Sequence, residues 1–139
     1  MKVILFTLAS LLVLSLCACA RATYPANYRI HDIWVLKSMN GEEIVNPSSQ
    51  LPVLEINLTR GEVMGNDGCN EYSAPILKSN KKKLSIGTLQ RTKLACPTSE
   101  LPDRYAALLP RVKTYGLKGL NLMLFDATGD CLITFRKVD

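Results

Sequence analysis

The segment Val53-Leu54-Glu55-Ile56-Asn57-Leu58-Thr59-Arg60-Gly61-Glu62-Val63-Met64-Gly65 decides the fold class, because it holds two strand-like stretches joined by a turn. Apolar and polar residues alternate from 53 to 58, which is the pattern of a strand with one buried face. Arg60-Gly61 then turns the chain. The segment therefore predicts two neighbouring antiparallel strands.

Similar patterns on both sides extend this sheet. Upstream, the apolar positions from Ile30 to Leu36 predict a strand that ends at the hairpin-type turn Asn40-Gly41. Downstream, strands are predicted at 72–78, 84–89, 121–125 and 131–135, the last two forming a terminal hairpin. The segment Ser79-Asn80-Lys81-Lys82-Lys83 is expected to be a solvated hairpin tip, and its lysines fit a soluble turn better than a binding patch.

The apolar period changes between Leu101 and Tyr115, which predicts a helix. Apolar residues recur there at i, i+3, i+4 and i+7, as on one helix face: Tyr105, Leu108, Leu109 and Val112. Pro110 should kink or shorten this helix because it lacks the N–H that bonds one turn back, and Gly116 is the expected stop. Six or seven strands and one helix predict an α+β fold, with a curved antiparallel sheet packed on the helix.

The first 18 residues have the features of an export signal. Lys2 is followed by an apolar run to Leu16 that is too short to span a bilayer. The run ends in Leu16-Cys17-Ala18-Cys19, which resembles the lipobox of bacterial lipoproteins. Ala18 supplies the small residue before Cys19, whereas Cys17 would follow the larger Leu16. We therefore expect residues 1–18 to be a lipoprotein signal peptide and Cys19 to be the lipidated N-terminus.

This interpretation predicts a lipidated tether at 19–27, a single domain at 28–139 and an anchor that needs no further membrane segment. Position 20 is alanine and not the aspartate that retains Gram-negative lipoproteins in the inner membrane. We therefore expect the protein to be anchored at the periplasmic face of the outer membrane. The alternative is an ordinary signal with two bystander cysteines, which would give a soluble secreted protein.

Charge and composition exclude a nucleic-acid partner. With Lys2 removed, 16 basic residues stand against 12 acidic ones, a mild excess of about +4. The chain has no basic arm and no basic–aromatic motif. The membrane, reached through the lipid, and an unknown envelope protein or small ligand are the partners we expect.

The sequence offers no catalytic constellation, so we expect no enzymatic activity. His31 is the only histidine, and on a strand its neighbour Asp32 would point to the opposite face. A surface or edge imidazole is the simpler interpretation. The carboxylates are scattered, although a glycosidase pair could still meet in space. We expect neither a metal nor a cofactor.

Three cysteines remain after export, at 69, 96 and 131. They lack Cys-x-x-Cys spacing and a nearby histidine, which argues against zinc. In an oxidising compartment three thiols predict one disulfide and one leftover cysteine. Gly65-Asn66-Asp67-Gly68-Cys69-Asn70 lacks the ending of a phosphate loop. It predicts a tight turn or bulge in which Gly68 has a positive φ and Asn70 caps backbone groups.

An ordered set of landmarks covers the whole mature domain and resembles the META domain family, with the HslJ-like lipoproteins as the nearest named group. These landmarks are Trp34-x-Leu36, Gly41, Pro52-x-Leu54, Val63-x-Gly65-x-x-Gly68-Cys69-Asn70, Leu84-x-Ile86-Gly87, Thr92-x-x-Ala95-Cys96, Glu100, Tyr105, Leu108, Tyr115 and Leu122-x-Leu124.

The resemblance implies a small conical β-barrel or strongly curved sheet with a helix against one opening. It implies a non-catalytic role in envelope integrity, stress response or novobiocin tolerance, with secretion or virulence ascribed to some members. Because Cys69 and Cys96 lie in the shared motifs, it also implies that these two form the disulfide and that Cys131 is buried as a small apolar residue.

Two alternative functions stay open, a lipid-binding or small-ligand-binding barrel that acts as a carrier or secretion-pilot factor, and an inhibitor of a host hydrolase. A packed interior would favour a module, whereas an apolar pocket of several hundred Å³ would favour a ligand.

Overall fold

The computed structural model describes residues 27–45 and 50–138. The predicted signal peptide 1–18, the predicted lipidation site Cys19 and the predicted tether up to residue 26 lie outside the described residues. Within the described part the elements are β1 (Ile33–Met39), β2 (Glu42–Glu43), β3 (Val53–Asn57), β4 (Glu62–Asn66), β5 (Glu71–Ser79), β6 (Leu84–Ile86), β7 (Gln90–Arg91), β8 (Thr114–Lys118), β9 (Asn121–Phe125), β10 (Cys131–Lys137), the α-helix α1 (Glu100–Leu108) and the 3₁₀ turns η1 (Tyr28–Ile30) and η2 (Leu109–Arg111).

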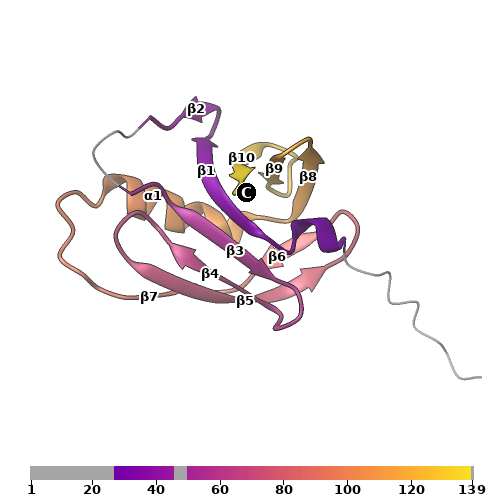
Figure 1. Cartoon of the computed structure of the whole chain (residues 1–139), viewed down its shortest axis with the longest axis horizontal. Helices are drawn as coiled ribbons and strands as arrows, with labels where there is room; N and C mark the ends of the chain where they lie inside the picture. The colour runs from indigo at the N-terminus through magenta and orange to yellow at the C-terminus, as the bar shows by residue number, and fades with distance from the viewer. Residues whose placement is uncertain (1–26, 46–49, 139) are drawn as a thin grey trace, which may run out of the picture.

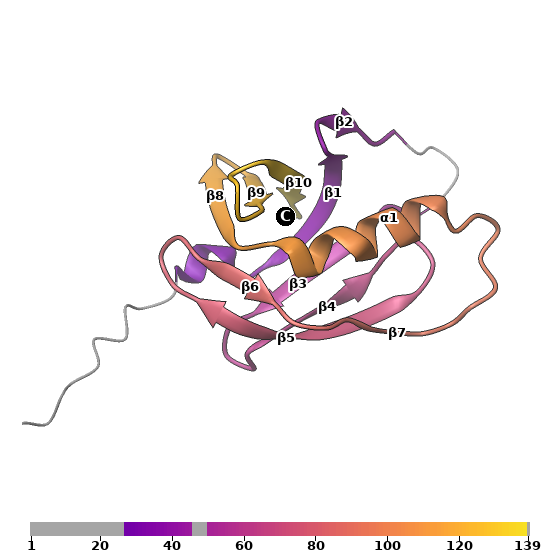
Figure 2. The same ribbon diagram turned by 180° about the vertical axis from the view of Figure 1, so that it is seen from behind.

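The main sheet is antiparallel throughout and follows the order β6-β5-β4-β3-β1-β10-β9-β8. The two-residue strand β2 pairs with β1, and β7 pairs with β5. In Figures 1 and 2 the strands curl around a common interior. The strong curvature follows from the right-handed twist of strands, which is accentuated at bulges. Such irregularities occur within the β1–β10, β9–β10 and β5–β6 pairings.

The two edges of the sheet meet and nearly close it into a barrel. Leu84 donates its backbone N–H to the Lys113 carbonyl (3.2 Å), and Tyr115 donates to the Lys82 carbonyl (3.0 Å). Lys83 and Thr114 form an isolated antiparallel bridge between these bonds. The structure therefore confirms the α+β expectation, with a barrel-shaped sheet of eight strands in order and one α-helix packed against it in the described residues.

The interior is filled by alternate residues of the strands and by one face of the helix. Buried and half-buried positions alternate along β3 and β9, as the sequence pattern predicts. The largest fully buried side chains are those of Trp34, Tyr105, Phe135, Ile30, Met39, Leu54, Ile56, Leu84, Leu109, Leu122, Leu124 and Leu132. Burial of each such side chain is worth about 1.5–3 kcal/mol, so this core supplies the main driving force for folding.

Helix α1 is fixed by Tyr105, which lies between opposite walls of the barrel. Its ring makes an edge contact with Phe135 of β10 (centroids 6.1 Å apart) and a tilted contact with Tyr72 of β5 (5.8 Å). Edge and tilted arrangements suit the charge distribution of aromatic rings. The helix therefore joins both halves of the sheet.

The predicted helix end was wrong. Helix α1 ends at Leu108 and continues only as the η2 turn that contains Pro110, because proline removes one backbone donor and crowds the preceding turn. Tyr115 and Gly116 lie on β8, a strand that the sequence analysis missed, so Gly116 does not stop the helix. The apolar period was misleading because Val112 is buried beyond the helix. The predicted strand 84–89 is also shorter, and β6 ends at Ile86.

Candidate functional site

The loop between β4 and β5 carries the motif Gly65-Asn66-Asp67-Gly68-Cys69-Asn70 and is shaped by its own side chains. Asp67 Oδ1 accepts hydrogen bonds from the backbone N–H groups of Cys69 (3.0 Å) and Asn70 (2.7 Å). Asn66 Oδ1 accepts one from the Gly68 N–H (2.7 Å). Asp and Asn side chains often hold turns in this way, so the loop has a defined shape before any long-range contact is considered.

Glycine is required at two positions of this motif, Gly65 on β4 and Gly68 in the loop. Gly68 has φ +101°, which confirms the predicted positive φ and which side-chain-bearing residues rarely adopt. Gly65 faces β3, and a Cβ atom there would collide with the Val53 backbone carbonyl. Both glycines therefore allow the loop to lie against the preceding strand.

A disulfide joins Cys69 of this loop to Cys96 in the segment before α1, as the resemblance implies. Their Cα atoms are 6.0 Å apart, a distance that a disulfide can bridge. The two cysteines are 27 residues apart in the sequence. The prediction that Cys131 is buried was wrong, because Cys131 is free and exposed at the start of β10. The bulge between Cys131 and Ile133 shifts the register there, so strand alternation alone could not place this side chain.

Asn70 caps backbone groups, as predicted, and it does so across the disulfide-linked segments. Its Oδ1 accepts from the Leu94 N–H (2.8 Å) and from the Thr92 hydroxyl (3.3 Å), and its Nδ2 donates to Cys96 Sγ (3.6 Å). Thr92 Oγ1 in turn accepts from the Glu71 N–H (3.1 Å). The shared Gly-Cys-Asn and Ala-Cys motifs are therefore the two sides of one contact.

Arg91 of β7 completes this contact by bridging two aspartates. Its Nε donates to Asp67 Oδ2 (2.8 Å), a second nitrogen lies 2.6 Å from the same oxygen, and both terminal nitrogens reach Asp103 Oδ1 (3.1 and 3.2 Å). The Asp67 side chain is 0% exposed and that of Arg91 26%. Burial lowers the pKa of Arg91, but hydrogen bonds to the two carboxylates outweigh burial and raise it overall.

We call Asp67, Cys69, Asn70, Arg91 and Cys96 the motif junction. The sequence analysis found Cys69, Asn70 and Cys96 but missed Asp67 and Arg91 as ion-pair partners. No local pattern could pair them, because they are 24 residues apart and meet only when β7 lies against β5. An acidic residue inside a glycine-rich turn was the one available signal.

A surface cavity of about 570 Å³ adjoins the junction, with Leu89, Lys93, Leu94 and Ser99 among its lining residues. Arg91 also lines it, but four of its contacts already go to Asp67 and Asp103. Its charge is thus largely neutralised within the protein. The arrangement is suited to fixing the loop and the helix start to the sheet.

His31 does not lie on a strand. It follows η1, is half-buried and stacks on Tyr28 with ring centroids 6.3 Å apart. Its Nδ1 is buried and has no hydrogen-bond partner among the described residues. The adjacent Asp32 carboxylate instead pairs with Lys137 at 2.8 Å, which lowers the pKa of Asp32. Within residues 27–45 and 50–138, no cluster of three or more His, Cys, Asp or Glu side chains could hold a metal ion.

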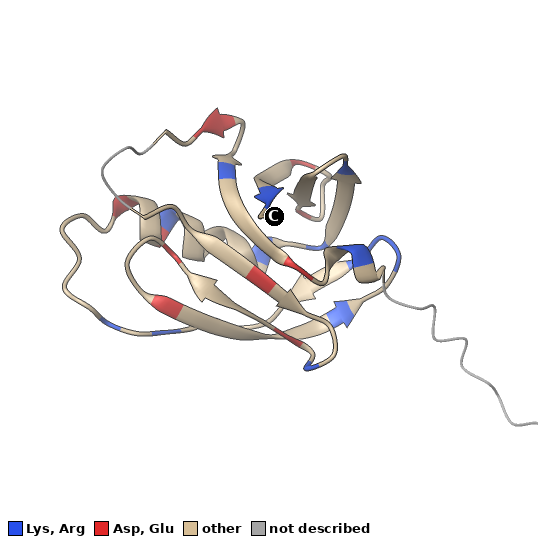
Figure 3. Ribbon diagram, in the orientation of Figure 1, with Lys and Arg blue, Asp and Glu red and all other residues tan. Residues whose placement is uncertain are grey.

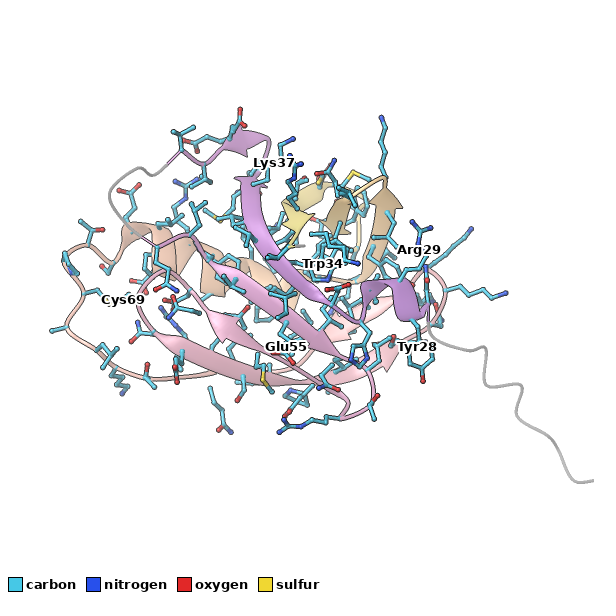
Figure 4. The ribbon with its side chains drawn as sticks, viewed as in Figure 1. Tyr28, Arg29, Trp34, Lys37, Glu55 and Cys69 are labelled. Atoms are coloured by element: carbon cyan, nitrogen blue, oxygen red, sulfur yellow. A yellow bond between two sulfur atoms is a disulfide. The ribbon has the colours of Figure 1, made fainter. Side chains whose placement is uncertain are left out.

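A second surface cavity, of about 530 Å³, lies on the outer face of β1 and β10 beside β2. Its apolar lining includes Val35, Ile44, Leu51 and Val138, and Lys37 and Arg136 are among its charged lining residues. Figure 4 shows Lys37 at the far end of β1 from Trp34, whose indole donates to the Ile30 carbonyl inside the fold (3.0 Å). This cavity, which we call the outer cavity, opens at the surface, and the core residue Leu36 is also part of its lining.

No helix in the described part of the chain has the length and apolar character needed to cross a bilayer.

Comparison with known proteins agrees with the landmarks. The META domain profile matches residues 29–139. An NMR structure of a protein from Burkholderia xenovorans is similar, with a TM-score of 0.60 and 26% identity over 86% of this chain and 93% of that one. A second NMR structure shares the fold with a TM-score of 0.57 and 22% identity over 77% of this chain and 89% of that one. A search of curated proteins gave no match. The chain belongs to the META domain family.

Proposed function

We propose that this protein is a lipid-anchored lipoprotein of the bacterial envelope whose META domain is a non-catalytic module, anchored at the periplasmic face of the outer membrane. In this proposal it supports envelope integrity under stress or in the presence of drugs such as novobiocin. The lipid on Cys19 supplies the membrane attachment, and the domain binds an envelope partner without any cofactor.

The observation that carries the proposal is the packed interior of the barrel. Trp34, Tyr105 and Phe135 are at most 2% exposed and occupy the space in which a ligand-carrying barrel would hold its cargo. The motif junction is likewise occupied by its own ion pairs and disulfide. Both features favour a rigid module over a carrier or an enzyme.

Support for the anchor comes from Leu16-Cys17-Ala18-Cys19 and from the point where the domain begins. Asn27 is eight residues after Cys19. Even a fully extended chain of that length spans only about 30 Å. The domain is therefore held close to the bilayer in this proposal.

Complementation of a deletion strain tests the proposal. We expect loss of the protein to increase sensitivity to novobiocin or detergent, and we expect the wild type and His31→Ala to restore resistance. Cys19→Ser should fail to restore it. If His31→Ala failed at wild-type protein levels, a catalytic role for the imidazole would replace the module.

The outer cavity favours a second candidate function, the binding of a small apolar molecule. Its walls include Val35, Ile44 and Val138, and its size is within the range of ligand sites. Val35→Trp should fill it and reduce binding of an apolar fluorescent probe such as anilinonaphthalene sulfonate. Leu77→Trp, at a 66% exposed position outside the cavity, is the matched control, and equal binding by both variants would exclude this site.

A further inference from the structure

We propose that one end of the barrel docks on the anionic headgroups of the membrane that anchors the protein. This basic end is formed by η1, the β5–β6 hairpin and the start of β8. Its cationic residues are Arg29, Lys78, Lys81, Lys82, Lys83 and Lys113. The inference rests on the proposed lipid anchor and adds an orientation, with the motif junction held away from the bilayer.

Backbone contacts bring these cations together from separate parts of the chain. Lys83 pairs with Thr114, and the Lys113 carbonyl accepts from the Leu84 N–H, so the hairpin tip lies beside the segment that leads into β8. The sequence shows only the run of three lysines, which alone fits a soluble turn. The fold adds charges from two further segments to the same end.

Asn27 links the basic end to the point where the tether reaches the domain. The Tyr115 hydroxyl donates to the Asn80 carbonyl in the lysine turn (2.8 Å). Burial raises the pKa of Tyr115, and the nearby Asn27 side chain partly opposes this rise. Asn27 Oδ1 also accepts from the Arg29 N–H (3.2 Å). Asn27 is thus connected to the lysine turn through Tyr115, so the tether would present this end to the bilayer.

The six cations are exposed, and no ion pair within the described residues neutralises them. Of the acids near this end, Asp32 is paired with Lys137 and Glu62 with Arg60. Exposed cations without a carboxylate partner keep their full charge for an external anion.

Charge is distributed unevenly between the two ends of the molecule. Figure 3 shows Lys and Arg gathered around η1 and the β5–β6 hairpin, whereas β2 and the start of α1 carry acids. Figure 4 places Tyr28 and Arg29 at the opposite end from Cys69 of the motif junction. The acids at the second end are largely paired with Arg91 and Arg104. The unpaired cations at the first end therefore give the domain its preferred orientation on an anionic bilayer.

Lipid headgroups fit this surface better than a specific small anion does. The lysine side chains extend from a turn whose shape is fixed by Asn80, which accepts from the N–H groups of Lys82 (3.0 Å) and Lys83 (2.8 Å). Among the described residues the one buried, unpartnered polar atom in this hairpin is Ser79 Oγ, and a single hydroxyl does not make a pocket for a specific anion. Each cation near an anionic membrane strengthens binding by about fivefold, and the attraction decays within a Debye length of about 10 Å.

Vesicle co-sedimentation of the mature chain, residues 19–139 with Cys19→Ser, measures docking without the lipid. We expect binding to vesicles that contain phosphatidylglycerol, little binding to pure phosphatidylcholine, and loss of binding in 0.5 M salt. The double variant Lys81→Gln, Lys82→Gln should weaken binding to the anionic vesicles by about 25-fold. Circular dichroism checks that the fold persists, as the Asn80 contacts to the backbone predict.

The control is the double variant Lys93→Gln, Lys118→Gln, which removes the same charge at exposed positions outside the basic end. It should bind within about twofold of the parent chain. Equal losses in the two variants, or equal binding to neutral and anionic vesicles, would overturn the proposal. Because the tested chain carries no lipid, failure here is distinguishable from failure of lipidation, which palmitate labelling reports.

Discussion

The buried side chains of Tyr72 and Tyr105 form a chain of two hydrogen bonds that ends at a backbone carbonyl. Their hydroxyls are 2.7 Å apart, and the Tyr72 hydroxyl donates to the Val53 carbonyl at 2.9 Å. Since Tyr72 uses its one proton on Val53, Tyr105 is the donor to Tyr72. The sequence predicts both as core aromatics, but it could not show these hydrogen bonds because the hydroxyls come from elements 33 residues apart.

Replacing Tyr72 or Tyr105 with phenylalanine should lower the free energy of unfolding by different amounts. Tyr72→Phe leaves both the Val53 carbonyl and the Tyr105 hydroxyl without this partner, which should lower the free energy of unfolding by about 2–3 kcal/mol. Tyr105→Phe keeps the bond to Val53 and should cost about 1 kcal/mol. Urea unfolding measures both, and a larger cost for Tyr105→Phe would contradict the donor assignment.

The same pair predicts instability at alkaline pH. Burial raises the pKa of Tyr72 and of Tyr105 above that of a free phenol, so the folded state favours the neutral forms. Their contribution is therefore complete below pH 10 and declines as the pH rises further, because the unfolded phenols ionise first. The free energy of unfolding should fall above pH 10 and fall less steeply in Tyr105→Phe. Equal slopes in the two proteins would exclude the pair as the cause.

Among the elements, β7 is only two residues long, yet it connects the β4–β5 loop to α1. Arg91→Ala would remove the cation from the fully buried Asp67, and breaking a buried ion pair in this way costs about 3–5 kcal/mol. Asp103→Asn is the control, because the Asp103 side chain is 61% exposed and its pairing should be worth about 0–1 kcal/mol. Thermal unfolding of both variants measures the difference. Similar melting temperatures would mean that Asp67 has found another partner.

The disulfide also stabilises the contact between the β4–β5 loop and the segment before α1, because it restricts the unfolded chain. The bridge closes a loop of 27 residues, so its reduction should cost about 3 kcal/mol in the chain-entropy model. The Cys69→Ser, Cys96→Ser variant should unfold at the same denaturant concentration as the reduced wild type. Cys131 is exposed and free, so in residues 19–139 carrying Cys19→Ser one thiol should react with a thiol reagent without denaturant. No reaction in the native state would contradict this placement.

For the whole molecule, the alternation at 53–58 and in the terminal hairpin was enough to predict the strands and the fold class. The helix end and β8 could not be predicted from periodicity, because Val112 and Tyr115 are buried by the barrel after the helix has ended. Barrel closure between β6 and β8 likewise depends on contacts between distant segments. In the motif junction, the family resemblance supplied the disulfide, whereas the Asp67–Arg91 ion pair depended on tertiary contacts.

The point where the tether joins the domain and the motif junction lie at opposite ends of the domain. Asn27 is connected through Tyr115 to the lysine turn at one end of the molecule, and the motif junction lies at the other end. A lipid on Cys19 would hold the first end at the bilayer and leave the second free for a partner. Without the lipid, only the salt-sensitive attraction of the basic end would hold the domain at the membrane whose integrity we propose it supports.

Metabolic labelling with palmitate tests whether Cys19 carries a lipid. Cells that express the full chain should yield a labelled protein that is extracted with the membrane fraction, and Cys17→Ser should be labelled equally because Cys17 is removed with the signal. Cys19→Ser should carry no label and should accumulate as a precursor. Undiminished labelling of Cys19→Ser, or an unlabelled wild-type protein in the soluble fraction, would contradict lipidation at Cys19.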